Sequence, residues 1–325
     1  MPEVRTGTVT VWRQLSPVLA TFRLAPEEGH RFPSYEAGQY MALRREGCRL
    51  TQRVAGPDGH PRYLPDLDEA GRQKRGPVTH AYSLASAPFQ TEREGHVEFL
   101  VVLEMASTLG RFTESLFDME PRQGGSMRYV ERIVGDFTLA RRVREATHVL
   151  LVATGTGLAP LVSMVRQLDH DASSGRPVPP KVTLLYANRT WPELAFHEEL
   201  AGIAAANRFD FVYVPSVSRP GVEQGREAVG QGRANNILRL ALGLPMAEEE
   251  AFEEARRSGS DTTDLEAAVV RAVSPQLPPG VDLDALRARL DPASTVVLTC
   301  GNPAPMADIR QVAQSRGMRV EREAW

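Results

Sequence analysis

Hydrophobic and polar residues alternate in short runs over the first third of the chain. These runs are rich in Thr, Val and aromatic residues and cover residues 5–13, 18–24, 38–43, 96–103 and 127–133. The run HVEFLVVL at 96–103 is apolar enough for a strand that is buried over most of its length. Many short strands without intervening helices predict an antiparallel β-barrel.

From about residue 147, strand-like and helical patterns alternate. Apolar runs typical of strands cover 148–153, 181–187, 209–214 and 295–300, and helical patterns cover 160–168, 191–206 and 304–316. This alternation predicts a parallel sheet with right-handed crossovers. We therefore expect two domains, an antiparallel β-barrel over 1–142 and an α/β domain over 143–325. A basic, helix-prone stretch at 138–147 would join them.

Two segments interrupt these patterns. Residues 56–77 contain four prolines and four glycines among mixed charges, which predicts an inserted loop. Residues 243–292 are acidic and helical in parts, with patterned apolar positions only at Leu283, Leu286 and Leu290. We expect both segments to be peripheral covers.

Composition limits the class of function. The net charge of -3 gives no overall field that would favour nucleic acid or an anionic membrane. No run of about 18 apolar residues occurs and the N-terminus lacks the apolar core of a signal peptide, so we expect a cytoplasmic protein without a membrane span. The two cysteines, Cys48 and Cys300, are too few for a disulfide framework, a four-cysteine zinc site or a cysteine-ligated iron–sulfur cluster. The seven histidines show no metal-binding spacing, so we expect no metal site.

The turn after the run at 148–153 has the composition of a nucleotide-binding turn. It reads Thr154, Gly155, Thr156 and Gly157, followed by Leu-Ala-Pro at the start of a helical pattern. The two glycines allow a tight turn and a close approach of backbone N–H groups to a phosphate. The helix that follows would direct its positive end at a pyrophosphate. A Gly-x-Gly pair also occurs in plain tight turns, but here the strand–turn–helix context predicts a dinucleotide site.

Arginines stand where NAD-binding sheets usually offer a carboxylate to the ribose 2′-hydroxyl. Arg189 follows the second strand of the α/β domain, Ser218 and Arg219 follow the third, and Arg233 comes shortly after. Three guanidinium groups and a hydroxyl would suit a 2′-phosphate, which favours NADP(H). Three solvated arginines would give the same pattern.

Further motifs carry a resemblance to a known family. The segment HAYSLAS at 80–86 resembles the Arg-x-Tyr-Ser-x-x-Ser flavin motif of the ferredoxin–NADP reductase family. Residues 155–160 resemble that family's pyrophosphate loop, and the Cys-Gly-Asn-Pro run at 300–303 resembles its turn beside the nicotinamide. Residues 38–40 and 110–113 resemble its early barrel strand and the start of its FAD-pyrophosphate helix.

The match covers nearly the whole chain apart from the two inserted segments. The runs Gly-Asp-Phe-Thr-Leu at 135–139 and Gly-Leu-Pro-Met at 243–246, with a chain that ends in Trp325, resemble the bacterial ferredoxin/flavodoxin–NADP reductases. This resemblance implies an N-terminal FAD-binding barrel and a C-terminal NADP-binding sheet.

The resemblance also assigns residues to each cofactor. FAD would be held by His80, Ala81, Tyr82, Ser83, Gly110, Arg111, Phe112, Thr113 and Trp325. NADP(H) would be held by Thr154, Gly155, Thr156, Gly157, Arg189, Ser218, Arg219, Arg233 and Gly301. Ser83, Cys300 and Trp325 would take part in catalysis.

The chemistry of the side chains agrees with the roles that the resemblance implies. Tyr82 would lie against the isoalloxazine, Ser83 would hydrogen-bond flavin N5, and Cys300 would be a small polarizable group beside the nicotinamide. Trp325 would cover the flavin face on which the nicotinamide must stack. No general acid with a defined role is visible in the sequence. Glu321 and Glu323 lie near the C-terminus and could assist proton transfer.

One departure from the family pattern concerns charge. The family motif begins with an arginine that pairs with the FAD pyrophosphate, and this chain has His80 there. Either a neighbour such as Arg111 supplies the charge or FAD is bound more weakly. A second departure is Ala324, where some relatives have an aromatic residue, which leaves Trp325 as the stacking group.

The implied activity is hydride exchange between NADPH and FAD and single-electron exchange with ferredoxin or flavodoxin, by a monomer or weak dimer. Two alternatives from the same fold are the reductase component of an oxygenase and a flavin or quinone reductase. An alternative of another class is a non-catalytic nucleotide-binding regulatory subunit, which would never hold flavin.

Deleting Trp325 should tighten nicotinamide binding. The nicotinamide C4 must come within roughly 3–3.5 Å of flavin N5, so a stacked aromatic has to be displaced first. Its stacking energy, on the order of 0.5–1.5 kcal/mol, is then subtracted from nicotinamide binding. The deletion should also narrow the preference for NADPH over NADH. Nucleotide titrations followed in the flavin spectrum test this, and identical affinities and spectra would show that Trp325 does not lie on the flavin.

Overall fold

The computed structural model describes residues 3–56, 61–104, 110–221 and 229–323. The chain divides into two compact units, Met1–Asp136 and Phe137–Trp325, and each has its own sheet and hydrophobic core. Trp325 and Ala324 lie outside the described residues. Within the described ranges, no helix combines the length and the apolar character needed to cross a bilayer.

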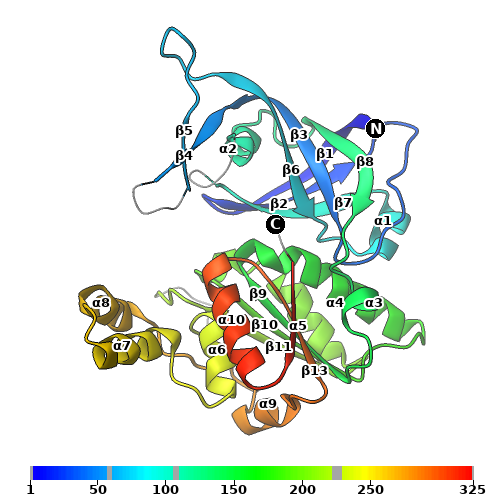
Figure 1. Ribbon diagram of the computed structural model, residues 1–325. Helices are drawn as coiled ribbons and strands as arrows, with labels where there is room; N and C mark the ends of the chain where they lie inside the picture. The colour runs from blue at the N-terminus through cyan, green and yellow to red at the C-terminus, as the bar shows by residue number, and fades with distance from the viewer. Residues whose placement is uncertain (1–2, 57–60, 105–109, 222–228, 324–325) are drawn as a thin grey trace. The chain divides into compact units, whose positions relative to one another are not determined.

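The first unit is built on one six-stranded antiparallel sheet (Figure 1). Its strands are β1 (Val4–Ser16), β2 (Leu19–Ala25), β3 (Tyr40–Arg49), β6 (Arg75–Ser83), β7 (Val97–Val102) and β8 (Ser126–Val134), in the order β6-β3-β8-β1-β2-β7. Just after β6, a backbone hydrogen bond of 2.8 Å from Ala85 N to Glu98 O links the two ends of this order. The predicted antiparallel β domain is confirmed.

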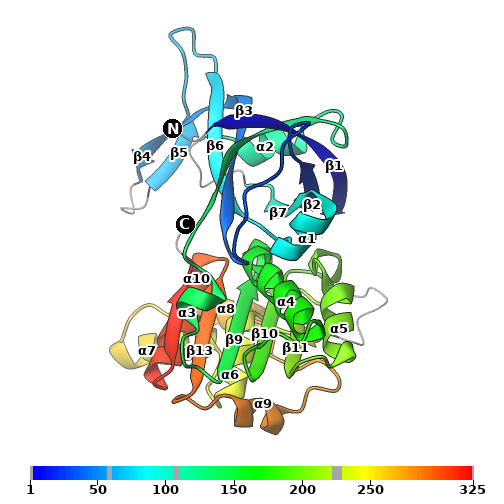
Figure 2. The ribbon, with the colours of Figure 1, turned by 90° about the vertical axis from the view of Figure 1, so that its right-hand side faces the viewer.

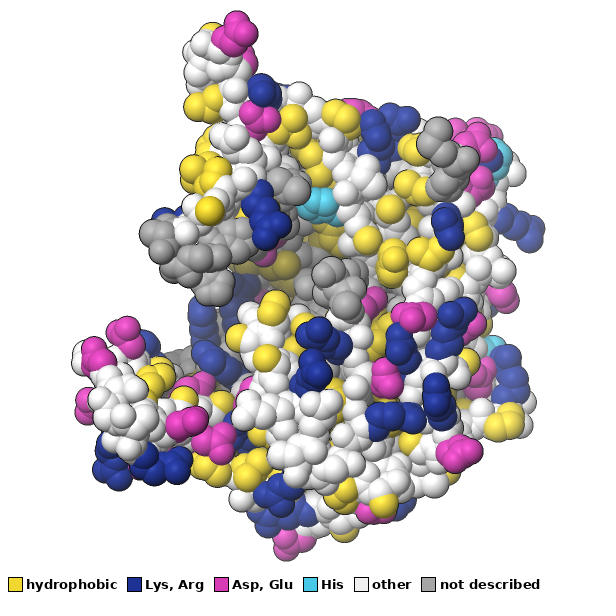
Figure 3. Space-filling model, viewed as in Figure 1, with side chains coloured by type: hydrophobic (Ala, Val, Ile, Leu, Met, Phe, Trp, Pro, Cys, Tyr) yellow, Lys and Arg dark blue, Asp and Glu magenta, His cyan; other side chains and the backbone are white. Residues whose placement is uncertain are grey.

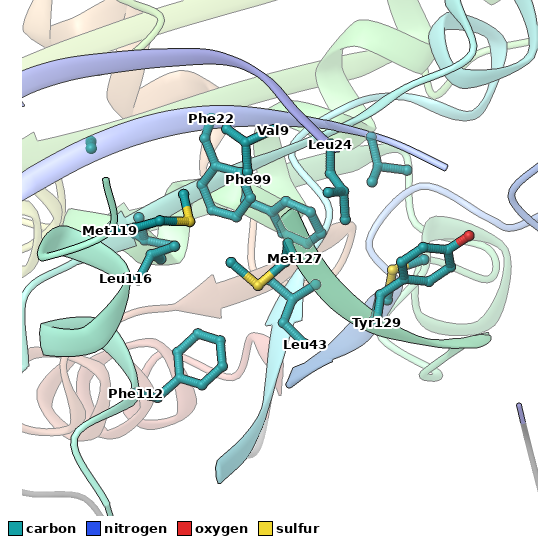
Figure 4. Close-up of a cluster of buried hydrophobic side chains, with 14 of the residues drawn as sticks. Val9, Phe22, Leu24, Leu43, Phe99, Phe112, Leu116, Met119, Met127 and Tyr129 are labelled. Carbon is teal, nitrogen blue, oxygen red and sulfur yellow. The ribbon is translucent and has the colours of Figure 1, made fainter. Parts of the chain in front are cut away.

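The core of this unit lies inside the curled sheet and under one short helix. Phe22 and Phe99 stack with ring centroids 4.9 Å apart. Helix α2 (Phe112–Phe117) adds Phe112 and Leu116, both fully buried. Figure 4 shows these two side chains in one cluster with buried residues of the strands. A second helix, α1 (Pro88–Glu94), lies between β6 and β7 in the chain. The helix α2 thus anchors the chain that precedes β8 to the core.

The segment expected to be a loop, residues 56–77, is partly a β-hairpin. Strands β4 (Thr51–Ala55) and β5 (Pro61–Pro65) pair antiparallel, and a further bridge joins Leu67 and Gln73 before β6 begins at Arg75. The two prolines of β5 stand at its ends, where a missing ladder donor is tolerated in a two-stranded edge. The prediction of a loop rested on the number of prolines and glycines. It took no account of where these residues stand relative to the hydrogen bonds between β4 and β5.

The second unit is built on a six-stranded parallel sheet. Its strands are β9 (His148–Thr154), β10 (Lys181–Asn188), β11 (Phe211–Val217), β12 (Gly230–Gln231), β13 (Thr295–Cys300) and β14 (Arg319–Arg322), in the order β12-β11-β10-β9-β13-β14. From β9 the chain moves outward to β12 and then returns to β13 on the other side of β9. The predicted parallel α/β domain is confirmed, and its strand order reverses between β9 and β13.

Helices cover both faces of the parallel sheet (Figure 2). They are α3 (Leu139–Arg142), α4 (Leu158–Ser173), α5 (His197–Ala206), α6 (Ala234–Ala241), α9 (Leu283–Arg289) and α10 (Pro303–Ser315). The continuous helix expected over 191–206 is divided into a 3-10 turn, Trp191–Glu193, and α5, with Phe196 at a φ of 57° between them. The division has a tertiary cause, because the Asn188 side chain donates to the Glu193 carbonyl at 2.6 Å and Ala195 N donates to the Tyr186 hydroxyl at 3.2 Å.

The segment 243–292 is only partly peripheral. Helices α7 (Ala247–Ser258) and α8 (Thr263–Arg271) stand to the side of the parallel sheet, and Figure 3 shows acidic and basic side chains together over them. In contrast, α9 buries Leu286 and Leu290 in the core of the unit, and Arg289 donates to the Val182 carbonyl at 3.2 Å. The expectation of a cover over the whole segment is therefore wrong for its last part.

A buried histidine lies at the start of β9. His148 is 1% exposed, and its ring nitrogens are 3.1 Å from Thr295 Oγ1 and 2.9 Å from Thr183 Oγ1. Burial lowers its pKa to about 4, with a further contribution from the charge of Arg289. The imidazole is therefore neutral in the folded protein at pH values where an unfolded chain would already bind a proton.

Replacing His148 with Gln should flatten the pH dependence of stability below neutrality. Between pH 6.5 and pH 4 the unfolded state binds the extra proton, so the free energy of unfolding of the native protein falls as the pH falls through this window. The loss should amount to at most about 3 kcal/mol. Urea denaturation at a series of pH values measures it, with His30→Gln as the control at an exposed histidine. Equal pH slopes in native protein and His148→Gln would contradict the assignment.

Candidate functional site

Two turns touch each other at the carboxyl edge of the parallel sheet. The turn after β9 continues as a 3-10 turn, Gly155–Gly157, with Gly155 at a φ of 56°. A Cβ added to Gly157 would lie 2.1 Å from the carbonyl oxygen of Cys300, at the end of the neighbouring β13. A Cβ added to Gly301, at a φ of 135°, would lie 2.1 Å from Thr154 Oγ1. Only glycine fits at either position.

A hydrogen bond joins the same two turns. Asn302 N donates to Thr154 Oγ1 at 2.8 Å, and the Asn302 side chain caps α10 by accepting from Ala304 N at 3.1 Å. The turns therefore bring the N-termini of α4 and α10 side by side where the strand order reverses. In open α/β sheets this is the place where ligands bind, and helix N-termini favour phosphate there. The structure thus brings the predicted Thr154–Gly157 and Cys300–Gly301 together.

Cys300 has a partner that the sequence did not assign. Its side chain is fully buried, and its thiol donates to Glu323 Oε2 at 3.3 Å. Glu323 is itself 6% exposed and follows β14, whose pairing with β13 carries it to this position. Glu321, the other acidic residue near the C-terminus, is instead paired with Arg142 at 3.0 Å. Of the two glutamates, only Glu323 reaches the Cys300 turn.

The predicted phosphate-binding residues lie at the carboxyl ends of three adjacent strands. Arg189 follows β10, Ser218 and Arg219 follow β11, and Arg233 follows β12. The backbone joins the first two positions, since Arg219 N donates to the Arg189 carbonyl at 2.8 Å and Ser218 N donates to the Asn188 carbonyl at 2.9 Å. The structure therefore gathers these side chains along one edge.

Two of the three arginines are already paired with carboxylates. Arg189 forms a forked ion pair with Glu193, with nitrogen–oxygen distances of 2.9 Å and 2.6 Å, and the Glu193 side chain is 6% exposed. Arg233 forms an ion pair of 3.0 Å with Glu248 on α7. Among the residues that the structure describes, no carboxylate pairs with the exposed Arg219.

Sequence reasoning missed these carboxylates for different reasons. Glu193 follows Arg189 by four residues, a spacing that permits an ion pair, so a signal existed. Glu248 follows Arg233 by fifteen residues and reaches it only because α7 packs on α6, which no local pattern reveals.

In the first unit, the predicted flavin residues lie on β6 and at the start of α2. The rings of His80 and Tyr82 both pack on Phe112, with centroids 5.5 Å and 5.4 Å away. Burial raises the pKa of Tyr82 well above its usual value, so its phenol stays protonated. Ser83 is buried at the end of β6, whereas Ala81 is exposed. The structure thus places His80 and Tyr82 on one face of the strand.

The last residue of the motif has a structural role. Ser86 is buried, its Oγ accepts from Glu98 N at 3.1 Å, and its carbonyl accepts from the Tyr35 hydroxyl at 2.9 Å. These bonds fix the chain just after Ser83 against β7. The hydroxyl of Ser86 is thus engaged in a hydrogen bond within the protein. The bonds at Ser86 also hold Ser83, three residues earlier, in position.

The turn before α2 is shaped by close contacts. Gly110 has a φ of 82°, and a Cβ there would lie 2.5 Å from Val78. Its N–H donates to Thr51 Oγ1 at 2.7 Å, while Thr113 Oγ1 accepts from Glu104 N at 2.8 Å. Arg111 is the residue before α2, so it lies at the same helix end as the ring of Phe112 that packs on His80. The residue expected to replace the family arginine thus precedes, in the chain, the phenylalanine on which His80 packs.

Comparison with known proteins agrees with this arrangement. Residues 151–247 match the family of oxidoreductase NAD-binding domains. A flavohemoprotein of Deinococcus radiodurans is 27% identical over 186 residues, which is 57% of this chain and 36% of that protein. The chain therefore spans about a third of the length of this curated relative.

Solved structures resemble the chain over its full length. The ferredoxin NADP+ reductase of Neisseria gonorrhoeae with bound FAD and NADP has a TM-score of 0.57 at 19% identity and covers 99% of both chains. The flavohem-like FAD/NAD-binding domain of the nitric oxide dioxygenase of Vibrio cholerae has a TM-score of 0.59 at 18% identity and covers 99% of this chain and 98% of that one. The chain thus has the two-domain fold of the ferredoxin–NADP reductase family, as its motifs predict.

Replacing Arg219 with Ala should weaken NADP+ binding and leave NAD+ binding nearly unchanged. A hydrogen bond to a charged group contributes about 1.5–3 kcal/mol, so the loss should be about tenfold or more in affinity for NADP+. Calorimetric titration with both nucleotides measures it. Equal losses for NADP+ and NAD+ would show that Arg219 shapes the edge of the sheet and does not contact the 2′-phosphate.

Proposed function

We propose that the chain is an FAD-containing reductase that takes hydride from NADPH and passes single electrons to ferredoxin or flavodoxin. The observation that carries the proposal is the close contact, possible only with glycine at positions 157 and 301, between the Gly155–Gly157 turn and the Cys300–Gly301 turn. This contact leaves backbone N–H groups and two helix N-termini at the reversal of strand order, which suits a pyrophosphate and the nicotinamide attached to it.

The residues of the first unit fit a flavin. Bound FAD would supply a ring system that accepts two electrons as a hydride and releases them one at a time. Tyr82, as a protonated phenol packed on Phe112, would offer an aromatic surface and a hydrogen-bond donor. Ser83 would hydrogen-bond flavin N5, and the backbone from Gly110 to Thr113 would bind the pyrophosphate. Within this scheme His80 contributes a stacked ring and Arg111 the charge.

The residues of the second unit fit NADPH. The turn from Thr154 to Gly157 would hold the pyrophosphate, and Ser218, Arg219 and Arg233 would meet the 2′-phosphate. Cys300 would pack beside the nicotinamide, held by its hydrogen bond to the buried Glu323. Because this bond uses the thiol as a donor, Cys300 would act as a neutral packing group and not as a nucleophile. Trp325 would gate the flavin face.

A second candidate is favoured by the ion pairs at the phosphate edge. With Arg189 and Arg233 paired to carboxylates, the edge is less cationic than three arginines suggest. Relatives named for NADH include a rat NADH-cytochrome b5 reductase, which is 29% identical over 73 residues, or 25% of its length. In this reading the chain would accept NADH as well and deliver electrons to a heme protein or an oxygenase. Both readings place it in the cytoplasm as a monomer or weak dimer.

The two candidates are separated by flavin analysis and an acceptor panel. Denaturing the purified protein should release about one FAD per chain. NADPH should then drive the reduction of ferredoxin or flavodoxin faster than that of cytochrome b5-type heme, quinone or free flavin. Faster turnover with NADH and a heme acceptor would favour the second candidate. A folded protein that never holds flavin would contradict both and leave the regulatory subunit.

A further inference from the structure

We infer that Glu248 sets the preference between phosphorylated and unphosphorylated coenzyme, by holding Arg233 in an ion pair that the coenzyme's 2′-phosphate has to replace. This inference rests on the proposed function for the location of the coenzyme. It assigns a role in specificity to α7, the acidic helix that the sequence suggested was only a cover.

The ion pair with Glu248 occupies only part of the Arg233 guanidinium group. Arg233 Nη1 lies 3.0 Å from Glu248 Oε1, and the arginine side chain remains 61% exposed. It stands two residues after the end of β12, at the same sheet edge as Arg219. An incoming 2′-phosphate can therefore reach the guanidinium, but it must do so beside an existing negative charge.

Glu248 is held in place from behind, unlike an ordinary surface carboxylate. Its side chain is 12% exposed, and Oε2 accepts from Asn236 Nδ2 at 2.9 Å. Asn236 is 1% exposed, and its Oδ1 accepts from Ala247 N at 3.0 Å, which fixes the first residue of α7. The carboxylate of Glu248 is thus oriented by a buried amide, so it cannot swing away without breaking that bond.

A second contact anchors the same turn of α7. Arg239 is 2% exposed and binds Glu250 at 2.8 Å, Asp308 on α10 and the carbonyl of Pro245 at 3.1 Å. These contacts tie the start of α7 to α6, and α6 in turn to α10. The position of Glu248 relative to Arg233 is therefore built into the unit.

Glu248 therefore weakens the binding of the 2′-phosphate and does not affect the binding of the nucleoside. A 2′-phosphate carries nearly two negative charges at neutral pH, so it competes with Glu248 for Arg233 and is repelled by it. A ribose 2′-hydroxyl carries no charge and meets neither effect. Removing the charge of Glu248 should therefore improve the binding of 2′-phosphorylated nucleotides alone.

The test compares two probes, 2′,5′-ADP and 5′-AMP, by calorimetry on the flavin-loaded protein. Glu248→Gln keeps the length of the side chain and its contact with Asn236 but removes the charge. It should raise the affinity for 2′,5′-ADP about two- to fivefold, the effect of one exposed ion pair, and leave the affinity for 5′-AMP unchanged. Glu254→Gln, the same charge change at an exposed position of the same helix, should alter neither affinity.

A double-mutant cycle isolates the pair. In an Arg233→Gln background, Glu248→Gln should raise the ratio of the two affinities by less than it does when Arg233 is present, because only the direct repulsion of the phosphate remains to be removed. An unchanged ratio in Glu248→Gln alone, or an equal gain in Glu254→Gln, would overturn the role of Glu248. If the native protein still binds 5′-AMP when one of these two outcomes is found, only the role of Glu248 is overturned and the proposed coenzyme site is retained. Failure of the native protein to bind either probe would overturn both the inference and the proposed function.

Discussion

The second unit depends on a contact between two pieces of backbone. Gly157 approaches the Cys300 carbonyl, and Gly301 approaches the carbonyl and hydroxyl oxygens of Thr154, so closely that neither position admits a Cβ. This closeness lets α4 and α10 begin beside each other, and it fixes where the positive ends of both helices point. The proposed pyrophosphate site, the position of Cys300 and the path of the chain into α10 all follow from it.

Charge at the edge of the same sheet is set by elements that come later in the chain. Glu193 neutralises Arg189 locally, whereas Glu248 reaches Arg233 through the packing of α7 on α6. Ion pairs that join an exposed arginine to a mostly buried carboxylate contribute little net stability, but they fix geometry when the carboxylate is also hydrogen-bonded. The result is an edge whose attraction for phosphate is smaller than its arginine content suggests and adjustable by single carboxylates.

Much of this architecture could be predicted from sequence where burial is strong. Strands such as β9 and β13 are mostly apolar and buried over nearly their whole length because helices cover both faces of their sheet, so their runs match the observed bounds closely. The turn at Gly155–Gly157 was visible because its glycines follow such a strand. In contrast, β14 has only four residues, of which Val320 alone is apolar, and the hairpin of β4 and β5 is rich in proline. Neither leaves a local signal.

The parts of the site that could not be predicted are those built by long-range packing. Phe196 interrupts a helical pattern because side chains from β10 bind the backbone there, and Glu323 meets Cys300 only because β14 pairs with β13. The Glu248 pair is of the same kind. The motifs locate the backbone that would hold the cofactors, whereas the partners that tune Cys300 and the arginines require the fold.

The proposed reductase function is tested most directly by the half-reaction itself. The flavin-loaded protein is mixed with NADPH under anaerobic conditions and the flavin absorbance is followed in a stopped-flow instrument. Rapid bleaching, slowed when the transferred C4 hydrogen of NADPH is replaced by deuterium, is the expected result, because hydride passes directly to flavin N5. A flavin that stays oxidised with both NADPH and NADH would contradict the assignment.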